Sequence, residues 1–228
     1  MARPPDVTFL VEALDPGSYD REVAARIALD LPGRGSVVLT GGTTAARIYG
    51  CLARADAGWG DLDVFFSDER CVPPDDDASN FGMAARLLLE PVGAPSVHRM
   101  RGEDDPEEAA RAYGAEVSAG AAEGFDLVLL GMGSDCHIAA LFPGSPALAA
   151  SELCVAVERP DGLGGLTLTP PALLASRTVL VVVAGGGKAE AVRRAVAGGQ
   201  EPQSCPARLL AEHPNATFLL DEGAASLL

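Results

Sequence analysis

Lysine is almost absent from this sequence of 228 residues, which contains sixteen arginines but only one lysine, Lys188. A GC-rich coding bias accounts for such a ratio, but it does not explain why the remaining lysine directly follows three glycines. Basic residues are also few in total, 17 against 32 acidic residues, and the net charge is −15. Nucleic acids and acidic membrane surfaces require a basic footprint, so the composition argues against both as partners. A small anionic ligand would have to be held by local positive groups.

The sequence also lacks the patterns of secreted and membrane proteins. Its five cysteines are scattered, odd in number and without CxxC spacing, which favours a reducing compartment over a disulfide framework. No apolar run approaches the roughly 20 residues that cross a bilayer. The N-terminal segment MARPPDVTF has no signal-peptide core. We therefore expect a cytoplasmic protein that does not contact a membrane.

Apolar residues are nevertheless plentiful, at 48% of the sequence. Short apolar runs that end in turn residues alternate with amphipathic segments, as in βαβ units. We predict strands at residues 7–11, 36–40, 62–66, 96–100, 125–130, 153–157, 166–169, 178–184 and 216–220, and helices at 19–31, from 43 or 44, from 79, at 106–120, from 170, around 192–196 and at 206–212. No internal repeat, linker or sharp change of composition divides residues 1–228, so we expect one domain.

This alternation predicts an α/β fold with a mostly parallel, doubly wound sheet and helices on both faces, in a Rossmann-like three-layer arrangement. The looser region between residues 143 and 169 is expected to form a small strand insertion. Polar residues that can cap helices stand at the predicted helix starts: Thr43 or Thr44, Ser79, Asp105, Thr169 and Asp221.

Four polar or glycine-rich segments directly follow predicted buried strands. They are residues 40–43 (TGGT), 67–70 (SDER), 131–137 (GMGSDCH) and 185–188 (GGGK). Because parallel strands present their carboxyl ends at one edge of a sheet, we expect these segments to gather there. Two of them are glycine turns that lead into a helix N-terminus, where amides and the helix dipole favour an anion. With Arg70 and Lys188 they predict a pocket for a phosphate or a similar anion.

The segment FDLVLLGMGSDCHIAALFP joins a buried strand to a titratable pair, Asp135 and His137. The simplest alternative is a turn with a capping aspartate and a surface histidine. The pair could also bind a metal, but nothing nearby supplies further ligands. Cys136 could be a thiol nucleophile, although sequence neighbours rarely face each other as nucleophile and base. His98 and His213 lie outside any glycine segment and are expected to be structural.

The other segments are not specific when each is taken alone. Gly41-Gly42 is neither a Walker A loop nor a GxGxxG dinucleotide loop, and turns between strands and helices often use glycine. The acidic and basic residues at 67–70 could form a solvated charge cluster. Lys188 could be an ordinary surface residue. Their shared position after buried strands is the observation that favours a functional site.

As a set and in this order, these motifs resemble the 6-phosphogluconolactonases, within the wider group that includes the glucosamine-6-phosphate deaminases. The resemblance covers about residues 37–227. It rests on TGGTT at 40–44, SDERCVP at 67–73 followed by Ser79-Asn80, GMGSDCHIAALFPG at 131–144, TLTPPAL at 167–173, the Gly187-Lys188 pair, and CPARLL with the closing LLDEGAA. The SDERxVP motif and the GxGxDxH…LFPG motif are the most specific part.

The resemblance implies hydrolysis of 6-phospho-D-glucono-1,5-lactone to 6-phosphogluconate in the pentose phosphate pathway, by a monomer or homodimer without metal or cofactor. It implies that His137 is the general base that activates water, with Asp135 or Asp68 orienting its ring. Amides of the 131–135 turn would stabilise the oxyanion. The implied substrate and phosphate pocket consists of Gly41, Gly42, Thr43, Arg70, Gly131, Gly133 and Lys188.

The sequence departs from this family pattern at several positions. Cys136 stands where the family usually has glycine, which implies strain of roughly 1–2 kcal/mol if the residue has a positive φ. Ile138 replaces the threonine usual in lactonases and is common in the deaminases, and Gly165 replaces an arginine that commonly precedes TLT. Ala45, Ala46 and Ala140 are further departures. A sugar-phosphate deaminase or isomerase, and a catalytically weakened sugar-phosphate binder, therefore remain alternatives.

Overall fold

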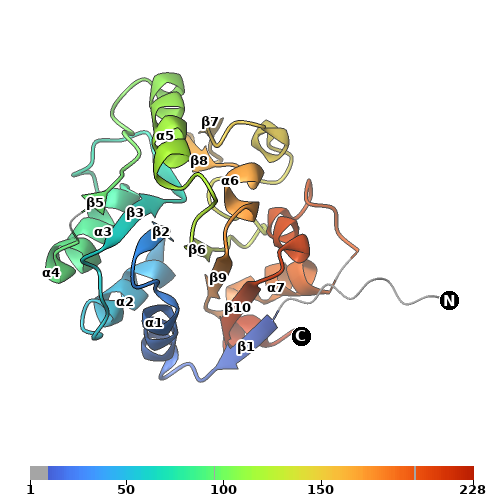
Figure 1. Ribbon diagram of the computed structural model, residues 1–228. Helices are drawn as coiled ribbons and strands as arrows, with labels where there is room; N and C mark the ends of the chain where they lie inside the picture. The colour runs from blue at the N-terminus through green and yellow to red at the C-terminus, as the bar shows by residue number, and fades with distance from the viewer. Residues whose placement is uncertain (1–9, 95, 198) are drawn as a thin grey trace.

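The computed structural model describes residues 10–94, 96–197 and 199–228, and it centres on a seven-stranded sheet (Figure 1). The strands of this sheet are β1 (Leu10–Leu14), β2 (Gly35–Leu39), β3 (Leu62–Phe66), β5 (Ser96–Val97), β6 (Leu127–Gly131), β9 (Thr178–Val183) and β10 (Ala216–Asp221). They lie in the order β1-β10-β9-β6-β2-β3-β5, and every neighbouring pair is parallel. The predicted α/β class and parallel sheet are confirmed.

The direction of winding reverses between β2 and β6, which lie side by side at the centre of the sheet. From β2 the chain proceeds through β3 to β5 on one side, whereas β6, β9 and β10 follow one another on the other side. Such a reversal leaves a crevice at the carboxyl ends of the two central strands, because the connections that follow them leave in opposite directions. The loops after β2 and β6 border this crevice.

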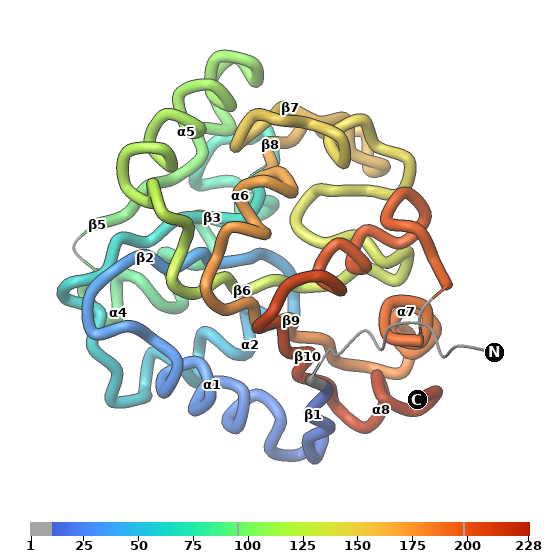
Figure 2. Tube along the Cα trace, turned by 45° about the vertical axis from the view of Figure 1, so that its right-hand side comes forward, coloured from blue at the N-terminus to red at the C-terminus, as the bar shows by residue number. Residues whose placement is uncertain are grey.

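Helices cover both faces of the sheet, as Figures 1 and 2 show. One face carries α1 (Tyr19–Asp30), α2 (Thr43–Leu52), α3 (Asn80–Ala84), the π-helix η1 (Ala85–Leu89) and α4 (Glu90–Val92), and the other carries α5 (Pro106–Gly120), α6 (Pro170–Leu174), α7 (Ala189–Val196) and the 3₁₀-helix η4 (Pro206–Glu212). Successive strand residues point to opposite faces, so Val37 packs in one core and Val38 in the other. The predicted three-layer arrangement is confirmed.

Most predicted elements are confirmed to within a few residues. Of the strand predicted at 7–11, residues 7–9 lie outside the described part of the chain, and β1 begins at Leu10. β5 is only two residues long, whereas a strand was predicted over 96–100. The short helices η2 (Pro146–Ala149), η3 (Gly186–Lys188) and α8 (Glu222–Ala225) complete the described structure. Within the described residues, no helix is both long and apolar enough to span a membrane.

A second, smaller sheet joins β4 (Asp68–Arg70), β8 (Gly164–Leu168) and β7 (Cys154–Glu158) in the antiparallel order β4-β8-β7. The predicted strand insertion between residues 143 and 169 is present as β7 and β8. The alternative that residues 67–70 form a solvated charge cluster is wrong, because Asp68 and Glu69 are buried. The last three residues of the segment become a strand because β8 pairs with them, Asp68 lying opposite Thr167.

Three of the predicted helix caps are confirmed. The side chains of Ser79, Asp105 and Asp221 accept hydrogen bonds from amides in the first turns of α3, α5 and α8. The predicted threonine cap of α2 is wrong, because Gly42 occupies the N-cap position with a φ of 95°. Thr169 stands at the N-cap of α6 as predicted, but its hydroxyl donates to a carbonyl oxygen and caps no amide.

Two buried tyrosines hold the backbone at the C-terminal ends of β2 and β3. The Tyr49 hydroxyl accepts from the Thr40 amide at 2.9 Å and donates to the Thr40 carbonyl at 2.7 Å. The Tyr113 hydroxyl makes the same two bonds to Phe66, at 2.7 and 3.0 Å. Burial raises the pKa of both hydroxyls, so they stay neutral and remain able to donate.

A buried carboxylate, that of Glu69, ties β4 to the start of α3. It accepts hydrogen bonds from the Ser79 hydroxyl at 2.9 Å and from the amides of Arg70, Asn80 and Phe81 at 2.7–2.8 Å. Burial raises the pKa of this carboxyl group, and the four donors oppose that effect. Glu69 therefore has a structural role within the SDER motif.

We predict that Glu69→Gln destabilises the fold by roughly 2–4 kcal/mol, because the new amide group would present N–H donors to amides that are themselves donors. Chemical denaturation followed by circular dichroism measures this change. Glu123→Gln is the matched control, since Glu123 is exposed on the surface, and it should leave the free energy of unfolding unchanged. Equal stability of the two variants would contradict the assignment.

Candidate active site

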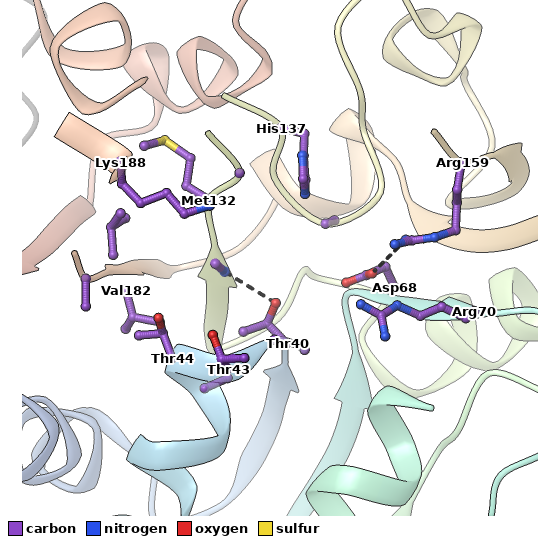
Figure 3. A pocket seen from close by; sticks show the side chains of 18 residues that line it. Thr40, Thr43, Thr44, Asp68, Arg70, Met132, His137, Arg159, Val182 and Lys188 are labelled. Carbon is purple, nitrogen blue, oxygen red and sulfur yellow. Dashed lines mark hydrogen bonds and ion pairs between the residues drawn. The ribbon is translucent and has the colours of Figure 1, made fainter. Parts of the chain in front are cut away.

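A pocket of about 190 Å³ opens at the carboxyl ends of the central strands (Figure 3). All four predicted strand-end segments contribute to it, so the prediction that they gather at one edge is confirmed. The lining residues are Thr40, Gly41, Gly42, Thr43, Thr44, Ala45, Asp68, Arg70, Gly131, Met132, Gly133, His137, Ala139, Arg159, Val182, Val183, Ala184 and Lys188. Of the predicted site residues, only Asp135 is not part of the lining.

Asp135 lies behind His137 and binds its ring. Its Oδ1 is 2.6 Å from Nδ1 of His137 and also accepts the His137 amide at 3.2 Å. The bond from His137, more than any other interaction, lowers the pKa of Asp135 to about 2. An ionised carboxylate at Nδ1 requires a proton on that nitrogen, which leaves Nε2 as the acceptor in the neutral ring. Nε2 has no partner among the residues that the structure describes.

Sequence reasoning left open whether Asp135 or Asp68 orients His137, and the contacts favour Asp135. Asp68 is buried, and its carboxylate instead accepts from the Ser67 hydroxyl at 2.8 Å and from Asn80 Nδ2 at 3.2 Å. It lies at the pocket wall beneath His137 in Figure 3, between two arginines. Asp68 therefore belongs to the pocket but not to the Asp135–His137 pair.

Position 133 requires glycine because its backbone passes very close to the Asp135–His137 pair. A Cβ at this position would lie 2.2 Å from Nδ1 of His137 and 2.4 Å from Oδ1 of Asp135. The Gly133 amide donates to the His137 carbonyl at 2.9 Å, and the Gly131 amide donates to the Thr40 hydroxyl at 3.3 Å. Two amides of the turn that was expected to stabilise an oxyanion are therefore already hydrogen-bonded.

Cys136, the residue between the pair, faces the core. Its φ is 76°, the left-handed conformation in which a side chain costs roughly 1–2 kcal/mol. The thiol is fully buried and donates to the Ala191 carbonyl at 3.5 Å. The hypothesis of a thiol nucleophile paired with His137 is therefore wrong, because Cys136 does not reach the pocket and the near side of the ring is bound to Asp135.

Metal binding is a further role that the sequence left open for the Asp135–His137 pair. Across the described parts of the chain, no group of three or more His, Cys, Asp or Glu residues could hold a metal ion, so the pair lacks additional ligands there. His98 stacks on Phe65, with ring centroids 4.4 Å apart, and His213 bonds the Ser176 carbonyl at 2.8 Å. Both histidines lie outside the pocket, in the structural positions expected for them.

The glycine loop after β2 brings backbone amides to the pocket floor. Gly41 allows close packing, since a Cβ there would lie 1.8 Å from Oδ1 of Asn80. Gly42 adopts a positive φ at the N-cap of α2, whose first-turn amides have no helical acceptor. In the loop after β9, Asp221 accepts the Gly185 amide through both carboxylate oxygens at 2.9 Å, which fixes the turn that carries Lys188.

The positive side chains stand on two sides of the pocket. In Figure 3, Lys188 lies on one side and Arg70 on the opposite side, with His137 above and between them. Arg70 and Lys188 therefore line the same pocket, as predicted, but lie on opposite sides of it. Arg159, which sequence reasoning did not identify, lies on the side of Arg70. No local motif marks Arg159, because it follows β7 and enters the pocket only through tertiary packing.

A free imidazole nitrogen, the amides of a helix N-terminus and separated cationic groups occupy the crevice of a doubly wound sheet. In an α/β protein, such a combination is suited to binding a small anionic molecule and to transferring a proton on it.

Comparison with known proteins identifies the family within this class. Residues 19–219 match the family described as glucosamine-6-phosphate isomerases/6-phosphogluconolactonase. A 6-phosphogluconolactonase of Mycobacterium tuberculosis is 40% identical over 245 residues, covering 98% of this chain and 96% of its own. One of Synechocystis is 38% identical over 205 residues, covering 86% and 85%. The crystal structure of a 6-phosphogluconolactonase from Shewanella baltica aligns with a TM-score of 0.85 at 27% identity, covering 94% of this chain and 97% of the other.

The chain therefore belongs to the glucosamine-6-phosphate isomerase/6-phosphogluconolactonase family, and the resemblance seen in the sequence is confirmed.

We predict that Gly133→Ala breaks the Asp135–His137 hydrogen bond, because the added methyl group would overlap both partners. Nuclear magnetic resonance of the histidine side chains should show loss of the hydrogen-bonded Nδ1 proton signal of His137. Gly131→Ala is the control, since a Cβ there meets nothing closer than a carbonyl oxygen at 3.8 Å. Survival of the signal in Gly133→Ala would show that the loop tolerates a side chain and that glycine is not required.

Proposed function

We propose that the protein is a 6-phosphogluconolactonase that hydrolyses 6-phospho-D-glucono-1,5-lactone to 6-phosphogluconate, a reaction of the pentose phosphate pathway. The observation that carries this proposal is the unpartnered Nε2 of His137 in the same pocket as Lys188 and the N-terminus of α2. Relatives at 38–40% identity that carry the name 6-phosphogluconolactonase support the choice of substrate.

His137 is the general base of the proposed reaction. Its Nε2 takes a proton from a water molecule, whose oxygen attacks C1 of the lactone and forms a tetrahedral oxyanion. The intermediate then expels the ring oxygen, which receives the proton from the imidazolium. Asp135 holds the ring in the required tautomer and stabilises the imidazolium while it exists. All atoms of water end in the product, and the base is regenerated.

The phosphate group of the substrate is placed on the side of Lys188. There the amides of Gly42 and Thr43 at the start of α2 supply donors, and the helix dipole favours a negative charge. The Lys188 ammonium makes no hydrogen bond or ion pair with the described residues and is available to a ligand. Arg70, on the opposite wall, contacts the substrate from its other end, and Gly41, Gly131 and Gly133 allow the sugar to approach the backbone.

The runner-up function is deamination or isomerisation of an amino-sugar phosphate, since the family description names both groups of enzymes. A solved glucosamine-6-phosphate deaminase aligns with a TM-score of 0.87, but at 23% identity this likeness concerns the fold alone. Ammonia release from glucosamine 6-phosphate would favour this function. A protein that binds 6-phosphogluconate without accelerating lactone opening would be the weakened binder that Cys136 and Gly165 suggested.

We predict that His137→Ala lowers the rate of lactone opening roughly 10²–10⁴-fold, the usual contribution of a general base. Initial rates with freshly prepared lactone, corrected for spontaneous hydrolysis, measure the effect, and circular dichroism checks the fold. His98→Gln is the matched control, because His98 lies outside the pocket, and it should retain activity. Unchanged turnover in His137→Ala would refute the proposed mechanism.

Asp135→Asn is predicted to lower the maximal rate of lactone opening, because the imidazolium formed during the reaction loses the neighbouring anion. Asp135 adds no protonation step of its own above about pH 3, because its pKa is lowered to about 2 and it stays ionised. A pH–rate profile of both proteins tests this. An unchanged maximal rate in Asp135→Asn would mean that Asp135 does not act on His137.

A further inference from the structure

Arg159 is a charged side chain that is almost fully buried at the pocket wall. Only 9% of its side chain is exposed. Its guanidinium carbon lies 5.5 Å from the centre of the Phe142 ring, a cation–π arrangement that holds the group from one side. Burying a guanidinium is costly unless it is paired, so its position in the cavity needs an explanation.

The partners of Arg159 leave one of its nitrogens without a hydrogen bond. Nε and Nη2 donate to Oδ2 of Asp161 at 3.2 and 3.0 Å. Nη1 is 3.8 Å from Oδ2 of Asp68, which is within ion-pair range but too long for a hydrogen bond. Nη1 therefore has an ion-pair partner but no hydrogen-bond acceptor among the described residues, and Arg159 lines the pocket. Figure 3 shows the guanidinium directed at Asp68 from the pocket wall.

Gly165 on β8 creates the space through which the Arg159 stem passes. A Cβ at position 165 would lie 2.9 Å from Cδ and 3.2 Å from Cγ of Arg159. The same Cβ would be 3.3 Å from the Glu69 carbonyl, which belongs to the paired strand β4 and cannot move freely. Any larger residue at 165 would displace the stem of Arg159. Arg159 and Gly165 therefore act as a unit.

The two sides of the pocket suit the two ends of the proposed substrate. Lys188 and α2 lie on one side, while Arg70 and Arg159 flank Asp68 on the other (Figure 3). The reaction converts a neutral lactone carbonyl into a carboxylate, so the product carries a phosphate at one end of the carbon chain and a carboxylate at the other. With the phosphate beside Lys188, the C1 end faces the arginines.

We propose that Arg159 is a substrate-binding residue that recognises the C1 end, through the carbonyl oxygen of the lactone and the carboxylate of the product. This inference rests on the proposed lactonase function. Arg159 supplies charge-assisted hydrogen bonds that strengthen as negative charge develops on the C1 oxygen. Asp68 and Asp161 fix its direction, and Gly165 gives it access.

The test compares two ligands that differ only at C1. 6-Phosphogluconate has a carboxylate there, and glucitol 6-phosphate has a hydroxymethyl group. Isothermal titration calorimetry should show that Arg159→Gln raises the dissociation constant of 6-phosphogluconate roughly tenfold, as expected for loss of one charge-assisted contact. The dissociation constant of glucitol 6-phosphate should change less than twofold. Arg177→Gln is the matched control, because that arginine is 76% exposed and outside the pocket, and it should change neither.

Gly165→Ala provides an independent variant in which Arg159 is still present. It should reproduce the selective loss for 6-phosphogluconate, and the double variant Arg159→Gln/Gly165→Ala should show no further loss. Melting temperatures of all variants identify any that fail to fold, in which case the other single variant decides.

Equal weakening of both ligands would place Arg159 at the phosphate and overturn the inference, as would no weakening of either. If the unaltered protein bound neither ligand, the proposed function itself would fail. Selective loss in Arg159→Gln without lactone opening by the unaltered protein would leave Arg159 as a carboxylate-binding residue in a protein that is not a lactonase.

Discussion

The reversal of winding between β2 and β6 is the constraint on which the whole pocket depends. Residues 91 positions apart meet across it, as in the bond from the Gly131 amide to the Thr40 hydroxyl. The connection after β2 forms a helix on one face, while the segment after β6 packs into the core of the other face with α5 and α7. The backbone amides and the imidazole can therefore approach one ligand from two directions.

Buried side chains hold these strand ends in place before any ligand arrives. Tyr49 and Tyr113 each bind the amide and the carbonyl of one strand-end residue. Glu69 accepts three donors at the start of α3 and one from β4. The loop that carries His137 is joined to α7 by the Cys136 thiol. Such support keeps the donors of the pocket in position, so little reorganisation is needed for them to meet a ligand.

The sequence was sufficient to predict features that depend on local chemistry. Buried apolar runs followed by glycine identified the central strands and the loops at their ends, and the parallel arrangement brought those loops together. It was not sufficient where distant partners decide the outcome. The acidic residues of SDER have the composition of a solvated loop, yet β8 and Asn80 bury them. Arg159 reaches the pocket only because β7 and β8 pair and position 165 lacks a side chain. Glycine at position 165 therefore removes the arginine that is common there and makes room for Arg159.

Lys188 is the sole lysine of the chain, and it lies inside the pocket. Apart from the amino terminus, the only primary amine of the protein therefore lines the pocket. A reagent that labels amines reports directly on occupancy of that cavity, with no background from surface lysines. The arginine-rich composition thus gives the folded protein a built-in chemical reporter.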